Sequence, residues 1–222
     1  MLSRLADILV PAFGRLTVTR DGDGDTGFAP GSIIAANHTS LADPAVVLAA
    51  LHRLGVRPTV MAAAGLWRIP VLGRVLSHME YIPVQRGDRR AAHALDLAVA
   101  ALEQGRIVLI YAEGGLPDRR DAAEAAPGRF RSGLSRLVER TGAPVIPLGQ
   151  AGVRRISSGN AGKQLAGLAT APLRRPRLHV HVGLPVRPAG NRAERTRQAH
   201  TAVTAAWRTA ATHLCEPAAL AA

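Results

Sequence analysis

Apolar positions along the chain follow two alternating patterns. Short uninterrupted apolar runs, such as 107–111 and 144–148, are typical of strands that are covered on both faces of a sheet. Between such runs, apolar residues recur every three or four positions, which indicates helices with one buried face. The runs predict strands at 16–20, 32–36, 59–62, 81–84, 107–111, 144–148 and 178–182. The helical spacing predicts helices at 1–16, 43–53, 67–77, 88–104, 130–138 and 192–214.

Strands that alternate with helices predict an α/β layered fold, in which a mixed, largely parallel sheet is flanked by helices. At 222 residues the chain is expected to form a single domain, 1–222. Two long loops, 116–128 and 154–176, interrupt the alternation, and loops of such length in compact domains are often functional.

Three local patterns make finer predictions. The acidic, glycine-rich segment 21–25 predicts a hairpin turn that joins strands 16–20 and 32–36. In 178–182 apolar residues alternate with polar ones, which predicts a strand with one face in water. Asp43 followed by Pro44 suits a helix that begins with a capping carboxylate and a proline in its first turn.

Composition narrows the class of partner only slightly. The net charge of +12 favours anionic partners such as nucleic acid, a membrane surface or phosphorylated substrates. Nearly all of the basic charge is arginine, since Lys163 is the only lysine, and this bias can equally reflect genomic base composition. A lone Cys215 gives neither a disulfide framework nor a cysteine metal site, and fits the cytoplasm. The sequence predicts neither a membrane-spanning helix nor a signal peptide.

The segment after strand 32–36 carries the strongest chemical signal. His38 follows the strand directly, and Asp43 stands five residues further on, where a helix should begin. This spacing can place a carboxylate beside an imidazole, fixing the tautomer and leaving the second ring nitrogen as a general base for a substrate hydroxyl. Taken singly, Asp43 can be only a helix cap and His38 a polar residue satisfied by backbone. A metal site is disfavoured, because no second histidine stands at ligand spacing nearby.

Further candidates follow other strands. Arg86 and Glu113 come at the ends of 81–84 and 107–111, and carboxyl ends of parallel strands build sites in such folds. Arg86 and Arg131 are either surface charges or guanidinium groups that grip a phosphate. The turn of Glu113, Gly114 and Gly115 is either a simple turn or a place where backbone amides approach a ligand or oxyanion.

Four ordered blocks resemble the glycerolipid acyltransferase family, typified by 1-acylglycerol-3-phosphate acyltransferase. Asn37-His38-Thr39-Ser40-Leu41-Ala42-Asp43 is similar to its His-x4-Asp signature, and Tyr81-Ile82-Pro83-Val84-Gln85-Arg86 to its second block. Ile110-Tyr111-Ala112-Glu113-Gly114-Gly115 resembles the third block, usually Phe-Pro-Glu-Gly followed by Thr or Ser, and Pro144-Val145-Ile146-Pro147-Leu148 the fourth. The likeness runs from about residue 33 to residue 186 and implies the fold of glycerol-3-phosphate acyltransferases.

The resemblance also implies an activity. It is transfer of an acyl chain from acyl-CoA or acyl-carrier protein to a lysophospholipid hydroxyl, in phospholipid synthesis or remodelling. The acyl thioester would be the co-substrate, and neither another cofactor nor a metal is implied. His38 would be the base, Asp43 would orient it, and Arg86 would bind acceptor phosphate. The Glu113-Gly114-Gly115 turn and Pro147 would shape the acceptor region.

Two departures from the third block bear on the acceptor. Ala112 replaces the usual proline and Gly115 the usual hydroxyl residue, so a phosphate contact is missing or comes from Arg119, Arg120 or Arg131. The alternatives are therefore an acyltransferase for a sugar, polyol or secondary-metabolite hydroxyl, or a non-catalytic basic membrane-binding module. Few aromatic residues and no recognition motif argue against nucleic acid.

Two segments bear on location. Segment 1–16 predicts an amphipathic helix, interrupted or kinked at Pro11, that either packs on the domain or lies on a membrane. Loop 154–176 is either a solvated linker or a contact for anionic headgroups, through residues Arg154, Arg155, Lys163, Arg174 and Arg175. With a lipid acceptor, we expect a cytoplasmic protein that is peripheral on the inner face of the cell membrane.

Overall fold

The structure is a computed structural model that describes residues 2–22, 28–85, 90–116, 123–158 and 161–215. Its strands are β1 (Arg15–Arg20), β2 (Ile33–Ala36), β3 (Thr59–Ala63), β4 (Ile82–Val84), β5 (Val108–Tyr111), β6 (Val145–Ala151) and β7 (Arg177–Val182). Its α-helices are α1 (Leu2–Phe13), α2 (Asp43–Arg53), α3 (Pro70–His78), α4 (Arg90–Glu103), α5 (Gly133–Thr141), α6 (Ala161–Arg174) and α7 (Arg192–His213). Two short 3-10 helices are η1 (Ala64–Arg68) and η2 (Val153–Arg155).

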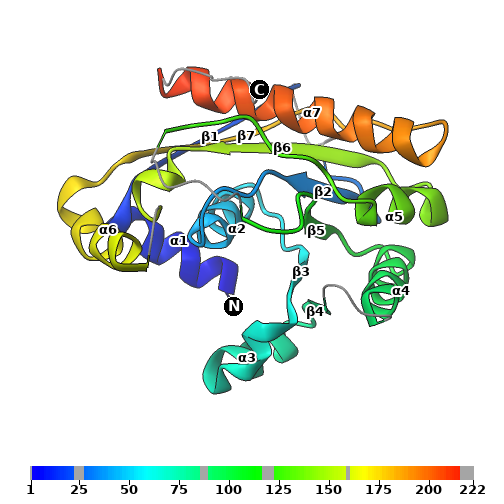
Figure 1. The fold of residues 1–222 in the computed structure, drawn as a ribbon, viewed down its shortest axis with the longest axis horizontal. Coiled ribbons are helices and arrows are strands. Elements are labelled where there is room, and N and C mark those ends of the chain that lie inside the picture. The colour runs from blue at the N-terminus through cyan, green and yellow to red at the C-terminus, as the bar shows by residue number, and fades with distance from the viewer. Residues whose placement is uncertain (1, 23–27, 86–89, 117–122, 159–160, 216–222) are drawn as a thin grey trace.

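All of these strands join one sheet in the order β1-β7-β6-β2-β5-β3-β4. Neighbouring strands are parallel except β6 and β7, which are antiparallel. The sheet lies between helix layers, with α7 over one face and α1, α2 and α6 on the other (Figure 1). The predicted α/β fold with a mixed, largely parallel sheet flanked by helices is therefore confirmed.

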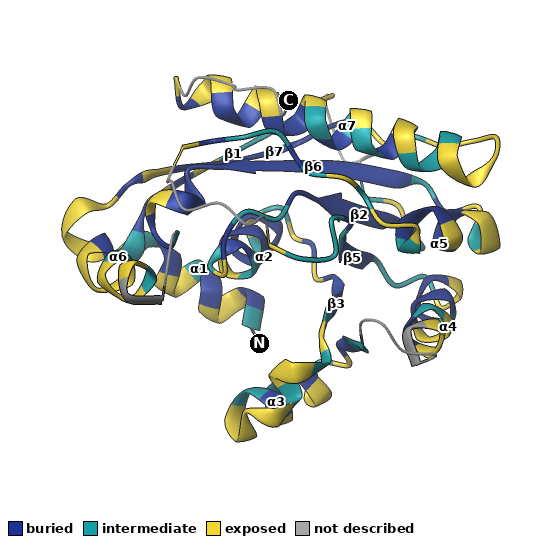
Figure 2. Cartoon of the chain, in the orientation of Figure 1, coloured by how far each residue is buried: buried dark blue, intermediate teal, exposed yellow. Residues whose placement is uncertain are grey.

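The central strand β2 shows why the sheet holds together. Each of its four residues is fully buried, and successive side chains enter opposite layers. Ile34 and Ala36 pack in the core beneath α1 and α2, whereas Ile33 and Ala35 pack in the core formed with α4, α5 and α7. An uninterrupted apolar sequence is what a strand with two covered faces requires. Figure 2 shows the buried sheet and the exposed outer faces of the helices.

The predicted hairpin between the first two strands is wrong. β1 pairs in parallel with β7, from Arg15 opposite Arg177 to Arg20 opposite Val182. Two strands, β7 and β6, therefore stand between β1 and β2. The prediction of a hairpin rests on the turn-forming residues of segment 21–25. Such local chemistry cannot reveal that β1 pairs with a strand far away in the sequence.

The predicted wet face of β7 is also wrong. The two polar residues that alternate with its apolar ones, His179 and His181, are buried. Both ring nitrogens of His179 and Nδ1 of His181 are hydrogen-bonded to the hydroxyls of Thr17 and Thr19 on β1, and α7 contacts the strand. Polar alternation here marks hydrogen bonding inside the sheet and not contact with water.

Several helix boundaries differ from the predictions. Loop 154–176 contains α6, and the helix predicted at 67–77 is divided into η1 and α3, which begins at Pro70. The cap of α2 is Ala42, so Asp43 is its first helical residue and its carboxylate does not cap the helix. α1 continues through Pro11 to Phe13, although Pro11 has no N–H to donate to the carbonyl of Asp7.

Candidate active site

The site begins where β2 ends, at the carboxyl end of the central strand. Asn37, the next residue, is fully buried and pairs with Gln150 of β6. Its side-chain Nδ2 donates to the carbonyl of Gln150 at 3.1 Å, and its Oδ1 accepts from the amide of Gln150 at 2.8 Å. The Asn37 side chain thus extends the ladder between β2 and β6 beyond the strand and fixes where the next residue lies.

His38 and Asp43 form the pair that the sequence predicts. His38 Nδ1 lies 2.9 Å from Asp43 Oδ2, and the side chains are 14% and 0% exposed, respectively. The same carboxylate oxygen accepts from the backbone amides of Thr39 at 2.5 Å and Ser40 at 2.9 Å. Asp43 therefore turns back over its own loop, and the two amides hold it in place to receive the imidazole.

This geometry selects one tautomer of His38. Asp43 Oδ2 already receives two amide protons and is an acceptor only, so the nitrogen facing it, Nδ1, carries the proton. The lone pair is then on Nε2, which has no hydrogen-bond partner among the described residues. A partly exposed imidazole with a free lone pair can accept a proton from an alcohol.

Thr39 is held by residues that the sequence did not single out for the site. Gln150 Nε2 donates to Thr39 Oγ1 at 3.0 Å, and Arg154 Nη1 donates to the Thr39 carbonyl at 3.0 Å. Arg154 is 3% exposed. Neither alternative for loop 154–176, a solvated linker or a contact for anionic headgroups, therefore describes Arg154. A polar Gln150 inside an apolar run was the available signal, since a buried amide requires partners.

Tyr111, the last residue of β5, packs on the imidazole of His38. The ring centroids are 4.4 Å apart and the planes are tilted by 31°. Burial, with the negative charge of Asp43 and the neighbouring Tyr81, holds the pKa of the Tyr111 hydroxyl well above its usual value. The phenol is therefore neutral at physiological pH, and its hydroxyl makes no hydrogen bond within the described residues.

Glu113 connects two backbone segments around the site. Its Oε1 accepts from the amide of His38 at 2.7 Å, and its Oε2 accepts from the amide of Gly128 at 2.8 Å. Burial raises the pKa of the Glu113 carboxyl above its usual value, and the two amide hydrogen bonds act in the opposite direction. Glu113 therefore holds the backbone of His38 against the backbone of Gly128.

Gly114 has a left-handed backbone, with φ of +69°, and its amide closes a turn onto the Tyr111 carbonyl at 3.0 Å. A Cβ at Gly114 would lie 2.5 Å from Cδ of Arg131, so the Arg131 side chain passes directly over this turn. Gly115 comes next, partly exposed. The structure thus brings Arg131 to the Glu113-Gly114-Gly115 turn, as a site at the end of β5 requires.

Two predicted site residues are not placed beside the imidazole. Pro147 is buried within β6, where it is paired with Ala35, three residues before His38 in the sequence. Arg86 lies outside the described residues, as do Arg119 and Arg120. Within the described part of the chain, no group of three or more histidine, cysteine or acidic residues could hold a metal ion.

Residues 19–150 match the model of the acyltransferase family. The chain is 26% identical over 125 residues to a chloroplastic 1-acyl-sn-glycerol-3-phosphate acyltransferase of Brassica napus, a match that covers 56% of this chain and 34% of the relative. A probable 1-acyl-sn-glycerol-3-phosphate acyltransferase of Mycoplasma genitalium is 26% identical over 118 residues, covering 52% of this chain and 42% of that relative. The matched region thus spans about a third to two fifths of the length of these relatives.

The fold agrees with a solved structure. The crystal structure of the 1-acyl-sn-glycerophosphate acyltransferase PlsC from Thermotoga maritima superposes with a TM-score of 0.67 at 18% identity, covering 96% of this chain and 78% of that one. The family match, which includes the whole segment from β2 through most of β6, contains both members of the imidazole–carboxylate pair. This chain therefore belongs to the acyltransferase family.

Proposed function

We propose that the chain is an O-acyltransferase that moves a fatty acyl chain from acyl-CoA or acyl-carrier protein to a lysophospholipid hydroxyl, such as that of 1-acylglycerol-3-phosphate. The observation that carries this proposal is the His38 imidazole, held by Asp43 at 2.9 Å at the end of the central strand with Nε2 free. The names of the matched relatives support the acceptor class.

The reaction would begin with the acceptor hydroxyl near His38 Nε2. As the acceptor oxygen bonds to the thioester carbonyl carbon, its proton passes to Nε2. The tetrahedral intermediate then collapses, the carbon–sulfur bond breaks, and the proton on Nε2 passes to the leaving thiolate. No acyl-enzyme is needed, because the imidazole serves first as base and then as acid.

The neighbours of His38 suit these steps. When Nε2 takes the proton, the imidazolium is stabilised by the Asp43 carboxylate on one side and by the face of Tyr111 on another. Developing charge on the thioester oxygen requires a donor. The Gly114 amide is occupied by its turn, whereas the Gly115 amide makes no hydrogen bond within the described residues and is the candidate for this role.

For acceptor phosphate, the described residues offer Arg131. Its side chain lies over Gly114 and is exposed at the rim of the site, where a planar guanidinium can hold a phosphate through two hydrogen bonds. Arg86 remains the second candidate from the sequence. Either arginine would place a lysophospholipid by its headgroup and present the free hydroxyl to His38.

A lipid acceptor requires a membrane surface, and two neighbouring helices have faces suited to it. Leu5, Ile8 and Leu9 of α1 and Leu165 and Leu173 of α6 are exposed. The two helices contact each other on the same side of the sheet (Figures 1 and 2). No described helix is both long and apolar enough to cross a bilayer. The exposed leucine and isoleucine side chains of these two helices support our proposal that the protein is peripheral on the inner face of the cell membrane.

The predicted apolar stripe of α1 supports this proposal. Residues Ser3, Ala6 and Val10 face the protein, while much of the stripe that the sequence suggested for packing faces outward. Of the two alternatives for segment 1–16, packing on the domain accounts for the buried face of the helix. The exposed apolar face supports our proposal that the helix also lies on a membrane. Large exposed apolar side chains on one helix face are typical of interfacial helices.

The test is transfer of a labelled acyl chain from acyl-CoA and from acyl-carrier protein to a panel of lysophospholipids. The wild type should form diacyl product with at least one acceptor, and His38→Ala should not. Absence of product with every donor and acceptor would contradict the proposal and favour a non-catalytic membrane-binding module.

One feature favours a second candidate acceptor. Gly115 has no hydroxyl where the family block usually has one, which removes a potential phosphate ligand. The alternative is a sugar, polyol or secondary-metabolite hydroxyl. Arg131→Gln tests whether Arg131 binds acceptor phosphate: the variant should raise KM for phosphate-bearing acceptors and leave KM for phosphate-free acceptors unchanged. Equal KM values for wild type and variant with those acceptors would remove Arg131 from the phosphate site.

A further inference from the structure

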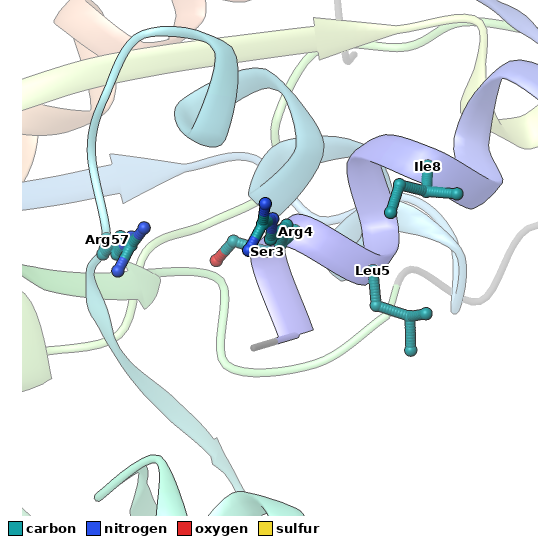
Figure 3. Close-up of a pocket in the computed structure, with 5 residues that line it drawn as sticks. All are labelled: Ser3, Arg4, Leu5, Ile8 and Arg57. Carbon is teal, nitrogen blue, oxygen red and sulfur yellow. The ribbon is translucent and has the colours of Figure 1, made fainter.

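A surface cavity lies on the α1 side of the molecule. It has a volume of about 420 Å³ and is lined by Ser3, Arg4, Leu5 and Ile8 of α1 and by Arg57, which lies between α2 and β3. Figure 3 shows Arg57 on one side and Ser3 with Arg4 on the other, and Leu5 and Ile8 further along the helix. Two separate elements thus each bring a guanidinium group to the same opening.

The cavity carries uncompensated positive charge. Neither Arg4 nor Arg57 makes an ion pair or a side-chain hydrogen bond with any residue that the structure describes. Asp7, one helical turn after Arg4, is instead bonded to Arg53 through Oδ1 and Nε at 2.6 Å. Since the nearby carboxylate is engaged with another arginine, both guanidinium groups are available to an external anion.

The rim of the cavity is apolar. Leu5 is 47% exposed and Ile8 is 68% exposed, so large aliphatic surfaces adjoin the two cations. Free phosphate or a nucleotide would leave these side chains in water. A ligand that combines an anionic head with aliphatic chains would cover both features at once.

The cavity is distinct from the candidate active site. Its inner side is closed by Ser3, which is 4% exposed and lies next to the Tyr81 phenol without forming a hydrogen bond of standard geometry. Tyr81 neighbours Tyr111, which packs on His38. Neither His38 nor Asp43 is among the residues that line the cavity.

We propose that this cavity is a second lipid site that binds the phosphate of an anionic membrane phospholipid. Arg4 and Arg57 would hold the phosphate, the Ser3 hydroxyl would lie beside it, and the acyl chains would rest against Leu5 and Ile8. The inference extends the proposed membrane location and does not depend on acyl transfer. A lipid held here would orient α1, and with it the site behind the tyrosines, against the membrane.

The test measures partition onto phosphatidylcholine vesicles with and without phosphatidylglycerol, by sedimentation. Each arginine near an anionic surface contributes a factor of about five, so Arg4→Gln/Arg57→Gln should weaken binding to the anionic vesicles about 30-fold. The matched control is Arg197→Gln/Arg208→Gln, which removes the same charge from exposed positions on α7, across the sheet. The control should bind within about twofold of the wild type.

A charge-conserving variant distinguishes a specific phosphate site from general electrostatic attraction to an anionic membrane. Lysine keeps the charge but lacks the planar fork that holds phosphate bidentately, so Arg4→Lys/Arg57→Lys should lose several-fold in binding. Wild-type binding by the lysine variant, or equal losses in the glutamine variant and its α7 control, would overturn the proposal. All four side chains are exposed, so these substitutions should leave folding intact, as circular dichroism can check.

Two further experiments determine whether the bound phosphate belongs to a lipid and whether membrane binding is independent of acyl transfer. Calorimetric binding of inorganic phosphate that is lost in Arg4→Gln/Arg57→Gln, together with unchanged partition of that variant onto anionic vesicles, would assign the cavity to free phosphate and overturn the lipid proposal. His38→Ala should partition like the wild type. A protein that partitions as expected but transfers no acyl chain would contradict the proposed function and leave this inference standing.

Discussion

The ring of Tyr111 lies against the imidazole of His38, with centroids 4.4 Å apart. The contact joins the ends of β2 and β5, neighbouring strands in which Ala36 is paired with Tyr111. It restricts the rotation of the imidazole away from Asp43 and would offer an aromatic face to the imidazolium of the proposed mechanism. The imidazole is therefore oriented by two residues, only one of which was apparent in the His-x4-Asp signature.

Two substitutions of Tyr111 should distinguish the effect of its ring on kcat from the effect of its hydroxyl. Tyr111→Phe keeps the ring and removes a buried hydroxyl that has no described partner, so kcat should stay within about twofold and stability should rise by up to about 1 kcal/mol. Tyr111→Leu removes the aromatic face and should lower kcat about tenfold. Steady-state kinetics and urea unfolding measure both effects. A large loss of kcat in Tyr111→Phe would show that the hydroxyl, not the ring, matters.

Glu113→Gln should impair the site through the backbone. The carboxylate accepts from two amides, whereas a glutamine side chain has one acceptor oxygen and must turn its NH2 group toward the other amide. We expect a loss of about 1–3 kcal/mol in unfolding free energy and a lower kcat. Glu103→Gln, at an exposed position at the end of α4, is the control and should change neither. Unaltered stability in Glu113→Gln would contradict the assignment of Glu113 as the acceptor that joins the amides of His38 and Gly128.

Asn37→Ala should be among the more destabilising polar substitutions. It leaves the buried amide and carbonyl of Gln150 without partners, at a cost of about 2–4 kcal/mol in urea unfolding. Asn191→Ala, which removes the exposed capping box of α7, should cost only about 1 kcal/mol. If the two variants lose equal stability, the Asn37–Gln150 pair does not have the importance assigned to it.

Stability should fall in mild acid because of His179. Thr17 Oγ1 donates to the Leu178 carbonyl, so His179 Nδ1 donates to Thr17 and Nε2 accepts from Thr19, which keeps the ring neutral. Burial, with neighbouring charge from His213, His181 and Arg177, lowers the pKa of His179 from 6.5 to about 4.

The unfolded chain binds the proton of this histidine below pH 6.5 and the folded chain does not. The contribution of His179 is therefore fully present above pH 6.5 and is lost as the pH falls toward 4. Between pH 7.5 and pH 5 the loss is about 2 kcal/mol. Urea unfolding at both values should show a smaller pH difference in His179→Asn. The exposed His93→Asn should retain the wild-type difference.

Much of the fold could be predicted from the sequence because local patterns were strong. Fully apolar runs identified the central strands, and the His38–Asp43 spacing identified the pair, since a short loop cannot separate the two side chains far. The predictions failed where contacts between segments far apart in the sequence determine the structure. β1 finds its partner in β7, and the histidines of β7 are satisfied by threonines of β1.

The rest of the site needed three-dimensional contacts. Gln150 and Arg154 reach the site from more than 100 residues along the chain, through Thr39. Two charged residues have contacts that local pattern could not predict. Arg154 is an internal donor and not a surface cation, and Glu113 binds backbone amides on both oxygens. Spacing reveals which residues can meet, but not which of their atoms are already engaged.

The most direct test of the proposed chemistry compares wild type with His38→Gln in transfer of a labelled acyl group to a lysophospholipid. Base catalysis typically contributes a factor of about 10²–10⁴, so kcat should fall by that amount while urea unfolding shows a folded variant. Transfer by His38→Gln at the wild-type rate would contradict the assignment of the imidazole as the base.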